Sequence, residues 1–270
     1  MAKATLSIIK CGDVSVDGTV CFKGATPPYS DLANIDWKTL PCTVCLIEHP
    51  KGRILVDTSW DKGIRTDAAA TVGEILSQVF PGTLPAGESA DERLAELGLA
   101  PKDIDCVVMT HLHCDHASGM KQLAGAKRFL ASDRELAAAA SNPAHYNTAM
   151  WDGLDVEAFS FVDSDKGPLG KSFDLFGDGT VVLACAPGHT PGQVAVIVGG
   201  PSEYVVLCGD AAYAPKSWEQ MVPGGAAIDE RLCMKSLEWL RACAADTACK
   251  AVIANHDPGF VGKTIEVSLD

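Results

Sequence analysis

Apolar and polar residues alternate in short runs along the first part of the chain, which is the pattern of half-buried β-strands. Glycine, proline and aspartate separate these runs, as they do in antiparallel hairpins. The predicted strands cover residues 4–16, 19–24, 43–49 and 53–60. The chain is therefore expected to begin with an antiparallel sheet.

The middle of the chain mixes strand and helix periodicities. Apolar residues at helical spacing predict helices over residues 72–80, 90–99 and 133–141, with another helix beginning at residue 118. Continuous apolar runs predict buried strands over residues 103–111 and 127–132. Apart from the predicted helices, residues 61–93 are irregular, and residues 142–170 follow neither period.

Strands return in the last third of the chain, over residues 179–187, 193–199, 204–210 and 250–258. Residues 228–245 form the clearest amphipathic helix, because four apolar residues fall near one stripe: Ile228, Leu232, Leu237 and Leu240. Strands, helices, strands and a helix in this order predict an α/β fold in which two mixed halves pack as a layered sandwich.

Length and composition allow one large domain or two small ones. The chain has 270 residues, of which 47% are apolar and 21% charged, so a sizeable core can form. The formal net charge is −13, and no cluster of lysine and arginine is present. Nucleic acids and anionic membranes are therefore not expected as partners, because both are bound through basic surfaces.

The eleven cysteines are scattered, and several lie in apolar runs where a thiol packs as a small apolar group. Cys42 and Cys45 form a C-x-x-C pair, but no second pair completes a four-cysteine zinc site, so we interpret them as structural thiols. The amino-terminal residues lack the apolar core of a signal peptide, and no apolar run approaches the ~20 residues that span a bilayer. A reduced, cytoplasmic protein is the expectation.

The stretch Thr-His-Leu-His-Cys-Asp-His, residues 110–116, holds three of the chain's seven histidines. It directly follows a predicted buried strand, and loops at the ends of strands commonly carry functional sites. Neutral imidazole is a good zinc ligand, and a carboxylate adds charge or bridges two ions. His111 and His113 can face one way while Asp115 and His116 face another, so this spacing suits two metal ions better than one.

Three further candidate ligands also follow predicted strands. His189 lies in APGHTPG, Asp210 in LCGDAAY and His256 in ANHDP. Together with the first cluster they give five histidines and two carboxylates, which is enough for two metal positions. The remaining histidines, His49 and His145, are interpreted as ordinary structural residues.

This set of residues resembles the metallo-β-lactamase superfamily. Its H-x-H-x-D-H motif stands here as residues 111–116, and the later ligands follow at intervals of 73, 21 and 46 residues. Asp57, in LVDT, matches a position behind the metal ligands of that family. The resemblance covers essentially the whole chain and implies one domain, residues 1–270, folded as a four-layer αβ/βα sandwich with metals at the sheet edges.

The resemblance also implies how the ligands divide between two metals. One ion would be held by His111, His113 and His189, and the other by Asp115, His116 and His256, with Asp210 bridging the two. Two Zn²⁺ ions per chain are expected, with other divalent metals left open. An iron-dependent oxidoreductase of the same fold is a less favoured alternative, because that branch typically has a glutamate at the position of His113.

Within the superfamily, Tyr213 favours the N-acyl-homoserine lactone lactonases, where a tyrosine three residues after the bridging aspartate reaches the substrate carbonyl. The resemblance thus implies a carboxylic ester hydrolase of the lactonase type, acting in quorum-signal degradation. A metal-bridging hydroxide would attack the lactone carbonyl, with Tyr213 stabilising the oxyanion and Asp115 helping to protonate the leaving oxygen. A glyoxalase II-like thioester hydrolase is the main alternative.

The chain departs from the family in places that concern the substrate. Cys114 stands where the family often has an aromatic residue, and residues 61–93 and 142–170, which would line the pocket, match no known member closely. Five large side chains in or directly beside these segments are candidate contacts for an acyl chain, although core packing is their more common role: Trp60, Phe80, Tyr146, Met150 and Trp151. A small-molecule lactone is the expected partner; which lactone, and the oligomeric state, are not predicted.

Overall fold

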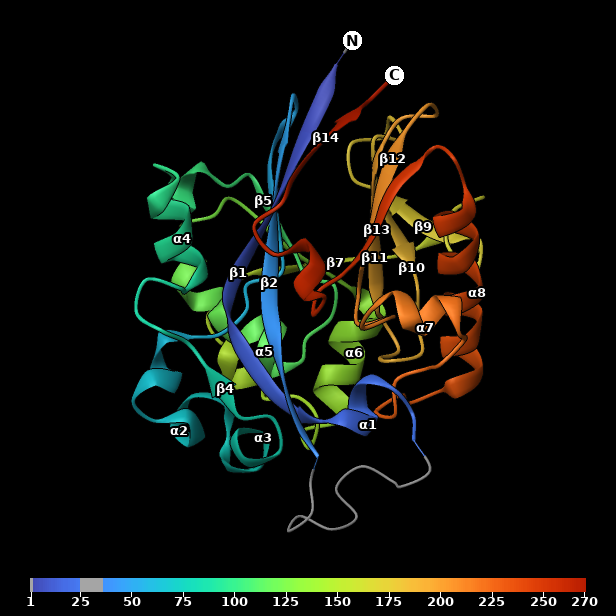
Figure 1. Cartoon of the computed structure of the whole chain (residues 1–270). Coiled ribbons are helices and arrows are strands. Elements are labelled where there is room, and N and C mark those ends of the chain that lie inside the picture. The colour runs from blue at the N-terminus through green and yellow to red at the C-terminus, as the bar shows by residue number, and fades with distance from the viewer. Residues whose placement is uncertain (1, 25–35) are drawn as a thin grey trace.

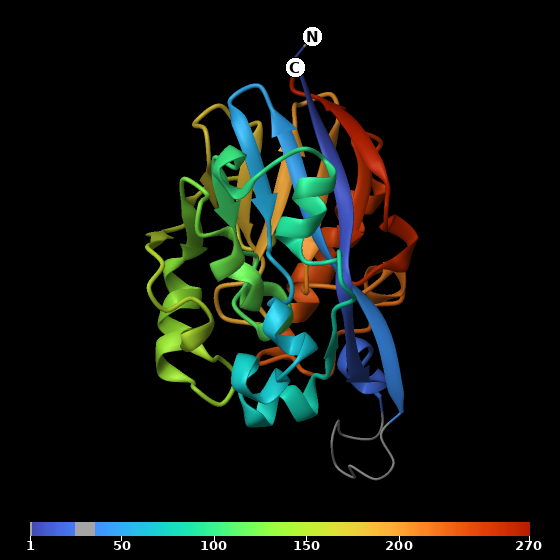
Figure 2. The same cartoon turned by 90° about the vertical axis from the view of Figure 1, so that its left-hand side faces the viewer.

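The computed structural model describes residues 2–24 and 36–270. Two β-sheets lie face to face at its centre, and helices cover the outer side of each sheet (Figure 1). The two chain ends lie close together at one end of the molecule (Figure 2). This arrangement is the four-layer αβ/βα sandwich that the sequence resemblance implied.

The first sheet has eight strands, in the order β14-β1-β2-β3-β5-β6-β7, with β4 paired to β1. Pairing is antiparallel from β14 to β3 and parallel from β3 to β7. The strands are β1 (Lys3–Asp17), β2 (Trp37–His49), β3 (Gly52–Val56), β4 (Gly82–Thr83), β5 (Cys106–Val108), β6 (Phe129–Ser132), β7 (Val156–Phe159) and β14 (Thr264–Ser268).

The second sheet has six strands, in the order β13-β12-β11-β10-β9-β8. All its neighbours are antiparallel except β12 and β13, which are parallel and are joined through a long helix, as a parallel crossover requires. The strands are β8 (Val162–Asp163), β9 (Lys171–Asp174), β10 (Val181–Cys185), β11 (Val194–Gly199), β12 (Tyr204–Gly209) and β13 (Cys249–Ala254).

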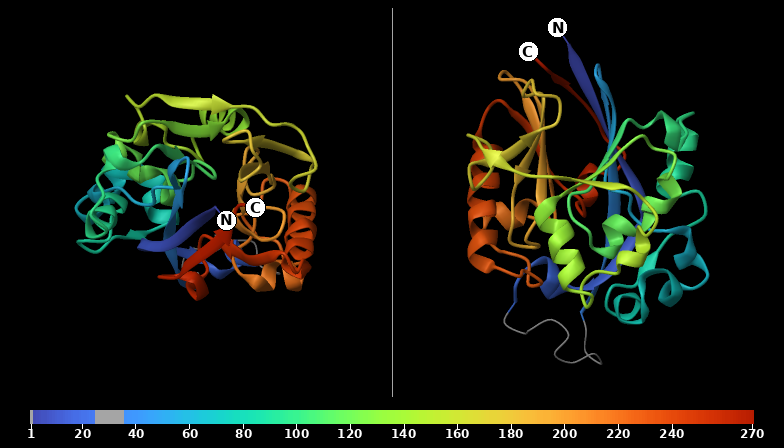
Figure 3. Two further views of the ribbon diagram at one scale, coloured as in Figure 1. Left: turned by 90° about the horizontal axis from the view of Figure 1, so that it is seen from above. Right: turned by 180° about the vertical axis from the view of Figure 1, so that it is seen from behind.

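Helices flank both sheets, as the view from above in Figure 3 shows. The α-helices are α1 (Gly18–Cys21), α2 (Ala68–Val72), α3 (Glu74–Val79), α4 (Ala90–Glu96), α5 (Cys114–Ala117), α6 (Asp133–Ser141), α7 (Pro215–Glu219) and α8 (Glu230–Ala245). Short 3₁₀ helices are η2 (Lys62–Arg65), η3 (Pro101–Asp103), η4 (Ser118–Leu123), η5 (Thr148–Met150) and η6 (Pro258–Phe260). Among the residues described, no helix is long and apolar enough to cross a membrane.

Three apolar clusters hold the layers together. The central one is formed by residues of both sheets, including Leu6, Ile54 and Leu183, all fully buried. The outer clusters lie under α4 on one side, with Leu94, and under α8 on the other, with Leu237. Each such buried side chain contributes about 1.5–3 kcal/mol, so the sandwich gives a rigid frame for the loops at the strand ends.

The structure corrects two predictions near the amino-terminus and the 61–93 segment. Residues 19–24 are not a strand, because the Asp17 carboxylate accepts hydrogen bonds from the N–H and hydroxyl of Thr19 and caps α1 instead. The predicted helix over 72–80 is split into α2 and α3 at Gly73, whose φ of 101° is incompatible with a continuous helix. The unassigned residues 142–170 contain η5, β7 and β8.

Candidate metal centre

The seven candidate ligands come together at one edge of the sandwich. His111 and His113 follow β5, and Asp115 and His116 lie on α5. The second sheet brings the others, because each lies in the loop that follows one of its strands: His189 after β10, Asp210 after β12 and His256 after β13. Strand ends of both sheets therefore meet at this site, as expected from the sequence.

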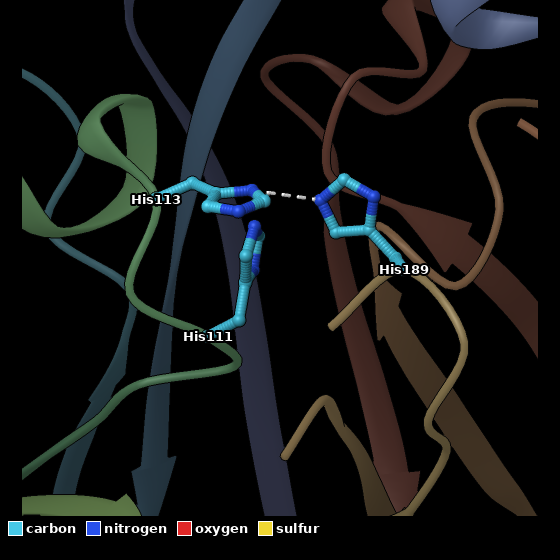
Figure 4. A group of neighbouring side chains, drawn as sticks. All are labelled: His111, His113 and His189. Carbon is cyan, nitrogen blue, oxygen red and sulfur yellow. Dashed lines mark hydrogen bonds between the residues drawn. The ribbon is translucent and has the colours of Figure 1, made fainter. Parts of the chain in front are cut away.

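Three imidazoles form the first group, drawn in Figure 4. Nδ1 of His113 lies 2.9 Å from Nε2 of His189, and each of the two rings stands nearly perpendicular to the ring of His111. One ring nitrogen from each residue lies within 4.8 Å of the others. The spacing is short enough for one ion to contact all three.

Electrostatics keeps this first group neutral. Burial lowers the pKa of all three imidazoles, and neighbouring histidines of the site add to the effect. The pKa of His113 falls to about 3. Neutral imidazoles carry the lone pairs that a metal ligand needs.

The second group combines two carboxylates with two imidazoles. Oδ1 of Asp210 lies 3.2 Å from Nε2 of His116 and 3.4 Å from Nε2 of His256. Oδ2 of Asp115 lies 3.4 Å from the same His256 nitrogen. The other oxygen of Asp210, Oδ2, lies 3.7 Å from Nε2 of His189. Asp210 therefore lies between the two groups and presents one oxygen to each.

Opposite charges dominate the second group. Burial alone would lower the pKa of His116 and of His256, but the neighbouring carboxylates outweigh it and raise both well above the ordinary value. The same contacts lower the pKa of Asp115 and Asp210 although burial opposes their ionisation. The two carboxylates thus favour positive charge beside them.

Hydrogen bonds behind the rings fix their orientation. Nδ1 of His116 lies 2.8 Å from the Asp57 carboxylate, and Nδ1 of His256 donates to the Pro41 carbonyl at 2.8 Å. Each bond assigns a proton to Nδ1 and leaves Nε2 facing the centre, as in metal-binding histidines generally.

Among the described residues, seven buried side-chain polar atoms lack a hydrogen-bond partner, and three of them belong to this site: Nε2 of His111, Nε2 of His116 and Oδ1 of Asp210. Unpaired polar atoms in an interior are costly, so such a group indicates a missing partner. Nitrogen and carboxylate donors in this arrangement fit a pair of divalent cations.

Comparison with known proteins agrees with this geometry. The family model described as the metallo-beta-lactamase superfamily matches residues 37–254. The chain belongs to the metallo-β-lactamase superfamily. Within it, the N-acyl homoserine lactonase AttM of Azorhizobium caulinodans is 28% identical over 227 residues, covering 81% of this chain and 82% of AttM.

Solved structures of the superfamily share the fold. An N-acyl homoserine lactone hydrolase, with the product N-hexanoyl-L-homoserine at its catalytic metal centre, has a TM-score of 0.78 at 22% identity, covering 96% of this chain and 95% of that one. AidC, a dizinc quorum-quenching lactonase, has a TM-score of 0.62 at 18% identity, covering 94% of this chain and 88% of AidC.

Two buried carboxylates support the loops of this superfamily site. Asp57, with a φ of 61°, accepts bonds from the N–H and hydroxyl of Thr110 and contacts His116. Glu135 accepts the N–H of Leu112 at 3.1 Å and the N–H of Gly192 at 3.0 Å, so it links the loops that carry His111–His113 and His189.

The sequence did not single out Glu135 as a site residue, because its spacing from Ser132 is explained by helix capping. Ser132 and Glu135 stand three residues apart at the start of α6, which is the capping-box pattern. Ser132 does accept the Glu135 N–H, but the Glu135 carboxylate turns towards the two ligand loops instead. Glu135 is only 1% exposed, but nothing in the pattern of residues 133–141 predicts this burial.

An apolar cavity of about 320 Å³ opens above the metal centre. His113, Asp115, His189, Asp210 and His256 form its polar end. Its walls are Val14, Val16, Val20, Leu40, Ile75, Leu76, Val79, Phe80, Cys114, Ala144, His145 and Ala226. The segments 61–93 and 142–170 both contribute to this lining, as predicted.

Tyr213 lies at the junction of cavity and metal centre. Its ring stacks on that of His256, with an interplanar angle of 14° and 5.8 Å between centroids. Burial and the adjacent Asp210 raise the pKa of the Tyr213 phenol well above its ordinary value, so the phenol remains a proton donor.

The other large side chains singled out in the sequence fall into two groups, those that line the cavity and those that do not. Phe80 lines the cavity. Trp60, Met150 and Trp151 are buried in the cluster on the outer side of the first sheet, so packing is their role. Tyr146 is buried in the same cluster, but its hydroxyl donates a hydrogen bond to the Glu135 carboxylate at 3.0 Å and its ring centroid lies 5.3 Å from that of His113. His49 is also structural, since its ring nitrogens contact the Thr180 hydroxyl and the Lys51 N–H. His145, in contrast, is exposed at the cavity rim.

The cysteines are all free thiols, and ten of the eleven are buried. Cys45 packs in the core between the sheets, as the sequence predicted for both members of the C-x-x-C pair. Cys42 is equally buried, but its sulfur also approaches Asp115 and His256. Sequence spacing alone gave no reason to connect Cys42 with residues more than seventy positions away.

Proposed function

We propose that this chain is a metal-dependent hydrolase that opens the lactone ring of N-acyl-homoserine lactones. One observation carries the proposal: two groups of metal-type donors share Asp210 at the closed end of an apolar cavity that also contains Tyr213. The named lactonase relatives support the same reaction.

Two ions, with Zn²⁺ the expected metal, would be held by the two groups of side chains. His111, His113 and His189 would bind one; Asp115, His116 and His256 would bind the other; and Asp210 would contact both. When bound, such a pair of ions lowers the pKa of water to give a nucleophile near neutral pH and polarises an ester carbonyl.

The protein's own side chains would direct the reaction. The Tyr213 phenol, kept protonated by its surroundings, would donate a hydrogen bond to the carbonyl oxygen as negative charge develops on it. Asp115 lies at the polar end of the cavity and would carry a proton from the attacking water to the ring oxygen when the C–O bond breaks. The product is the open hydroxy acid.

The cavity suits a substrate with one polar end and one apolar end. A lactone ring would lie against the ligands, and an acyl chain would cover apolar walls such as Leu76, Val79 and Phe80. A strongly charged substituent, such as the glutathione moiety of S-lactoylglutathione, would find few polar partners there.

The test is hydrolysis followed by proton release in a pH-stat with the zinc-loaded protein. We expect turnover of N-acyl-homoserine lactones, and the loss of nearly all turnover in His113→Ala, because His113 supplies one of the three nitrogens of the first group. Turnover of S-lactoylglutathione without any lactone turnover would contradict the proposal and identify a thioesterase.

Metal analysis of protein purified without added metal separates the remaining alternative. We expect two equivalents of zinc per chain. Near-stoichiometric iron accompanied by oxygen consumption would instead indicate an oxidoreductase.

A further inference from the structure

Cys42 occupies an irregular point in the first sheet. Along β1 and β2, Lys10 pairs with Thr43 and Asp13 pairs with Pro41, so two residues of β1 face Cys42 alone. This is a β-bulge, a feature that redirects side chains and is common beside active sites. The bulge lies where β2 passes the metal centre.

The backbone on both sides of Cys42 is tied to the loop that carries His256. The Thr43 N–H donates to Oδ1 of Asn255 at 3.0 Å, and Nδ2 of Asn255 donates to the Thr43 carbonyl at 2.8 Å. The Pro41 carbonyl accepts the hydrogen bond from Nδ1 of His256. Cys42 is therefore held at a fixed position against the His256 ring, without dependence on its own side-chain contacts.

The sulfur of Cys42 lies in the second ligand group. Sγ of Cys42, a carboxylate oxygen of Asp115 and a ring nitrogen of His256 are all within 4.8 Å of one another, and Cys42 is fully buried. Two unpaired buried atoms, Nε2 of His116 and Oδ1 of Asp210, belong to the same group. The Asp210 oxygen lies 3.4 Å from Nε2 of His256, so these unpaired atoms adjoin the group formed by Cys42, Asp115 and His256.

We propose that Cys42 is a direct thiolate ligand of the ion held by Asp115 and His256. The inference rests on the metal-dependent hydrolase proposed above and adds a ligand that its H-x-H-x-D-H motif does not contain. On binding, the Cys42 thiol releases its proton to solvent as the sulfur–metal bond forms.

A sulfur ligand would make the two positions chemically different. The first group offers three imidazoles, whereas the second would offer a thiolate, carboxylates and imidazoles. Thiolate is a soft donor that favours zinc over hard cations such as Mg²⁺ or Mn²⁺. The second position should therefore be selective for a thiophilic metal.

Neighbouring cysteines do not share this environment. Cys45, in the same C-x-x-C pair, has the apolar core between the sheets around it. Cys114 lies next to Asp115 in sequence but is in none of the potential metal-binding groups found among the described residues. These two residues are therefore matched controls for a buried thiol near, but not in, the ligand group.

Cobalt substitution tests the inference directly. The full-length protein loaded with two equivalents of Co²⁺ should show sulfur-to-cobalt charge-transfer absorption in the near ultraviolet. Cys42→Ala should abolish this absorption, while Cys45→Ala and Cys114→Ala retain it. Retention in Cys42→Ala, or its absence from wild type with both positions filled, would overturn the proposal.

Chelator competition gives a second readout on the same variants. Cys42→Ala should weaken zinc binding at one of the two positions by at least roughly tenfold, and the controls should match wild type. Unchanged affinity at both positions would argue against a bond to sulfur.

X-ray absorption at the zinc edge needs no substitution and so does not depend on how Cys42→Ala folds. In zinc-loaded wild type we expect a sulfur scatterer at about 2.3 Å in addition to nitrogen and oxygen at about 2.0–2.2 Å. A shell of nitrogen and oxygen alone, in a protein that binds two zinc ions and hydrolyses lactones, would reject the Cys42 ligand and leave the proposed function intact. Failure to bind zinc at all would reject both.

Discussion

The floor and the wall of the cavity are built on different physical principles. The floor consists of buried polar side chains at the strand ends. Asp57 holds the ring of His116, and Glu135 accepts backbone N–H bonds from two of the loops. The wall consists mainly of aliphatic and aromatic residues, among them Ile75, Leu76 and Val79 of α3. Ile75, at its edge, is 67% exposed.

This difference suggests that the floor determines catalysis and that the wall determines which substrate is preferred. Buried polar groups are directional, and losing a partner costs about 1–3 kcal/mol or more, so changes in the floor should be severe. Apolar contacts are non-directional and scale with area, so changes in the wall should be graded. Substitutions in the two regions should therefore produce effects of different size and kind.

The largest effect is expected at Asp210, which contacts both ligand groups. Asp210→Ala should release both ions and lower kcat/KM for lactones by at least ~10³-fold, because a catalytic constellation fails as a unit. Metal content after dialysis and pH-stat kinetics measure these outcomes. Asp163→Ala, at an exposed aspartate paired with Lys171, is the control. Two retained ions in Asp210→Ala would show that the groups bind metal independently.

Tyr213→Phe should change the chemistry and leave metal binding intact. Removing a donor to the developing oxyanion should lower kcat by roughly 10²-fold with little change in KM. Tyr204→Phe is a matched control, since the Tyr204 hydroxyl bonds Asp246 far from the cavity. If kcat is unaffected, the ring of Tyr213 serves only to pack on His256.

Substitution of Glu135 tests whether metal affinity depends on the residue that holds the ligand loops as well as on the ligands themselves. In Glu135→Gln the amide NH₂ group must face either the Leu112 or the Gly192 N–H, so one loop loses its anchor. We expect metal affinity, measured by chelator competition, to fall roughly 10- to 100-fold.

The control for Glu135→Gln is Glu157→Gln at an exposed residue paired with Arg128. Thermal unfolding of the metal-free proteins should be compared as well. A loss of stability without any loss of metal affinity would make Glu135 a purely structural residue.

Most residues of the floor could be predicted from the sequence. For the wall, the sequence predicted the contributing segments but not most of the individual residues. His111, His113, Asp115 and His116 are local in sequence, and so many imidazole and carboxylate groups directly after a buried strand are typical of a metal site. The Glu135 and Cys42 contacts were missed because they depend on which loops meet in space. From the sequence, the position of Glu135 is typical of a helix cap, and Cys42 is typical of a buried structural thiol.

The secondary-structure predictions failed where a single residue changed the local backbone conformation. The residues after β1 alternate like a strand, yet one carboxylate, that of Asp17, caps a helical turn there. The α2–α3 break follows from Gly73 alone. Such short elements bury little surface of their own, so propensity and pattern are weak guides to them.

The smallest effect is expected from the wall, and it should depend on the substrate. Ile75→Ala removes apolar area that a long acyl chain would cover, worth about 1 kcal/mol or roughly a fivefold rise in KM. A lactone with a short acyl chain would not reach Ile75 and should be hydrolysed at the wild-type rate. Leu97→Ala, at an exposed aliphatic residue that is outside the cavity lining, controls for general effects. An equal change in KM for long and short chains would mean that the acyl chain leaves the site by another route, and the α3 part of the wall would lose its role in selectivity.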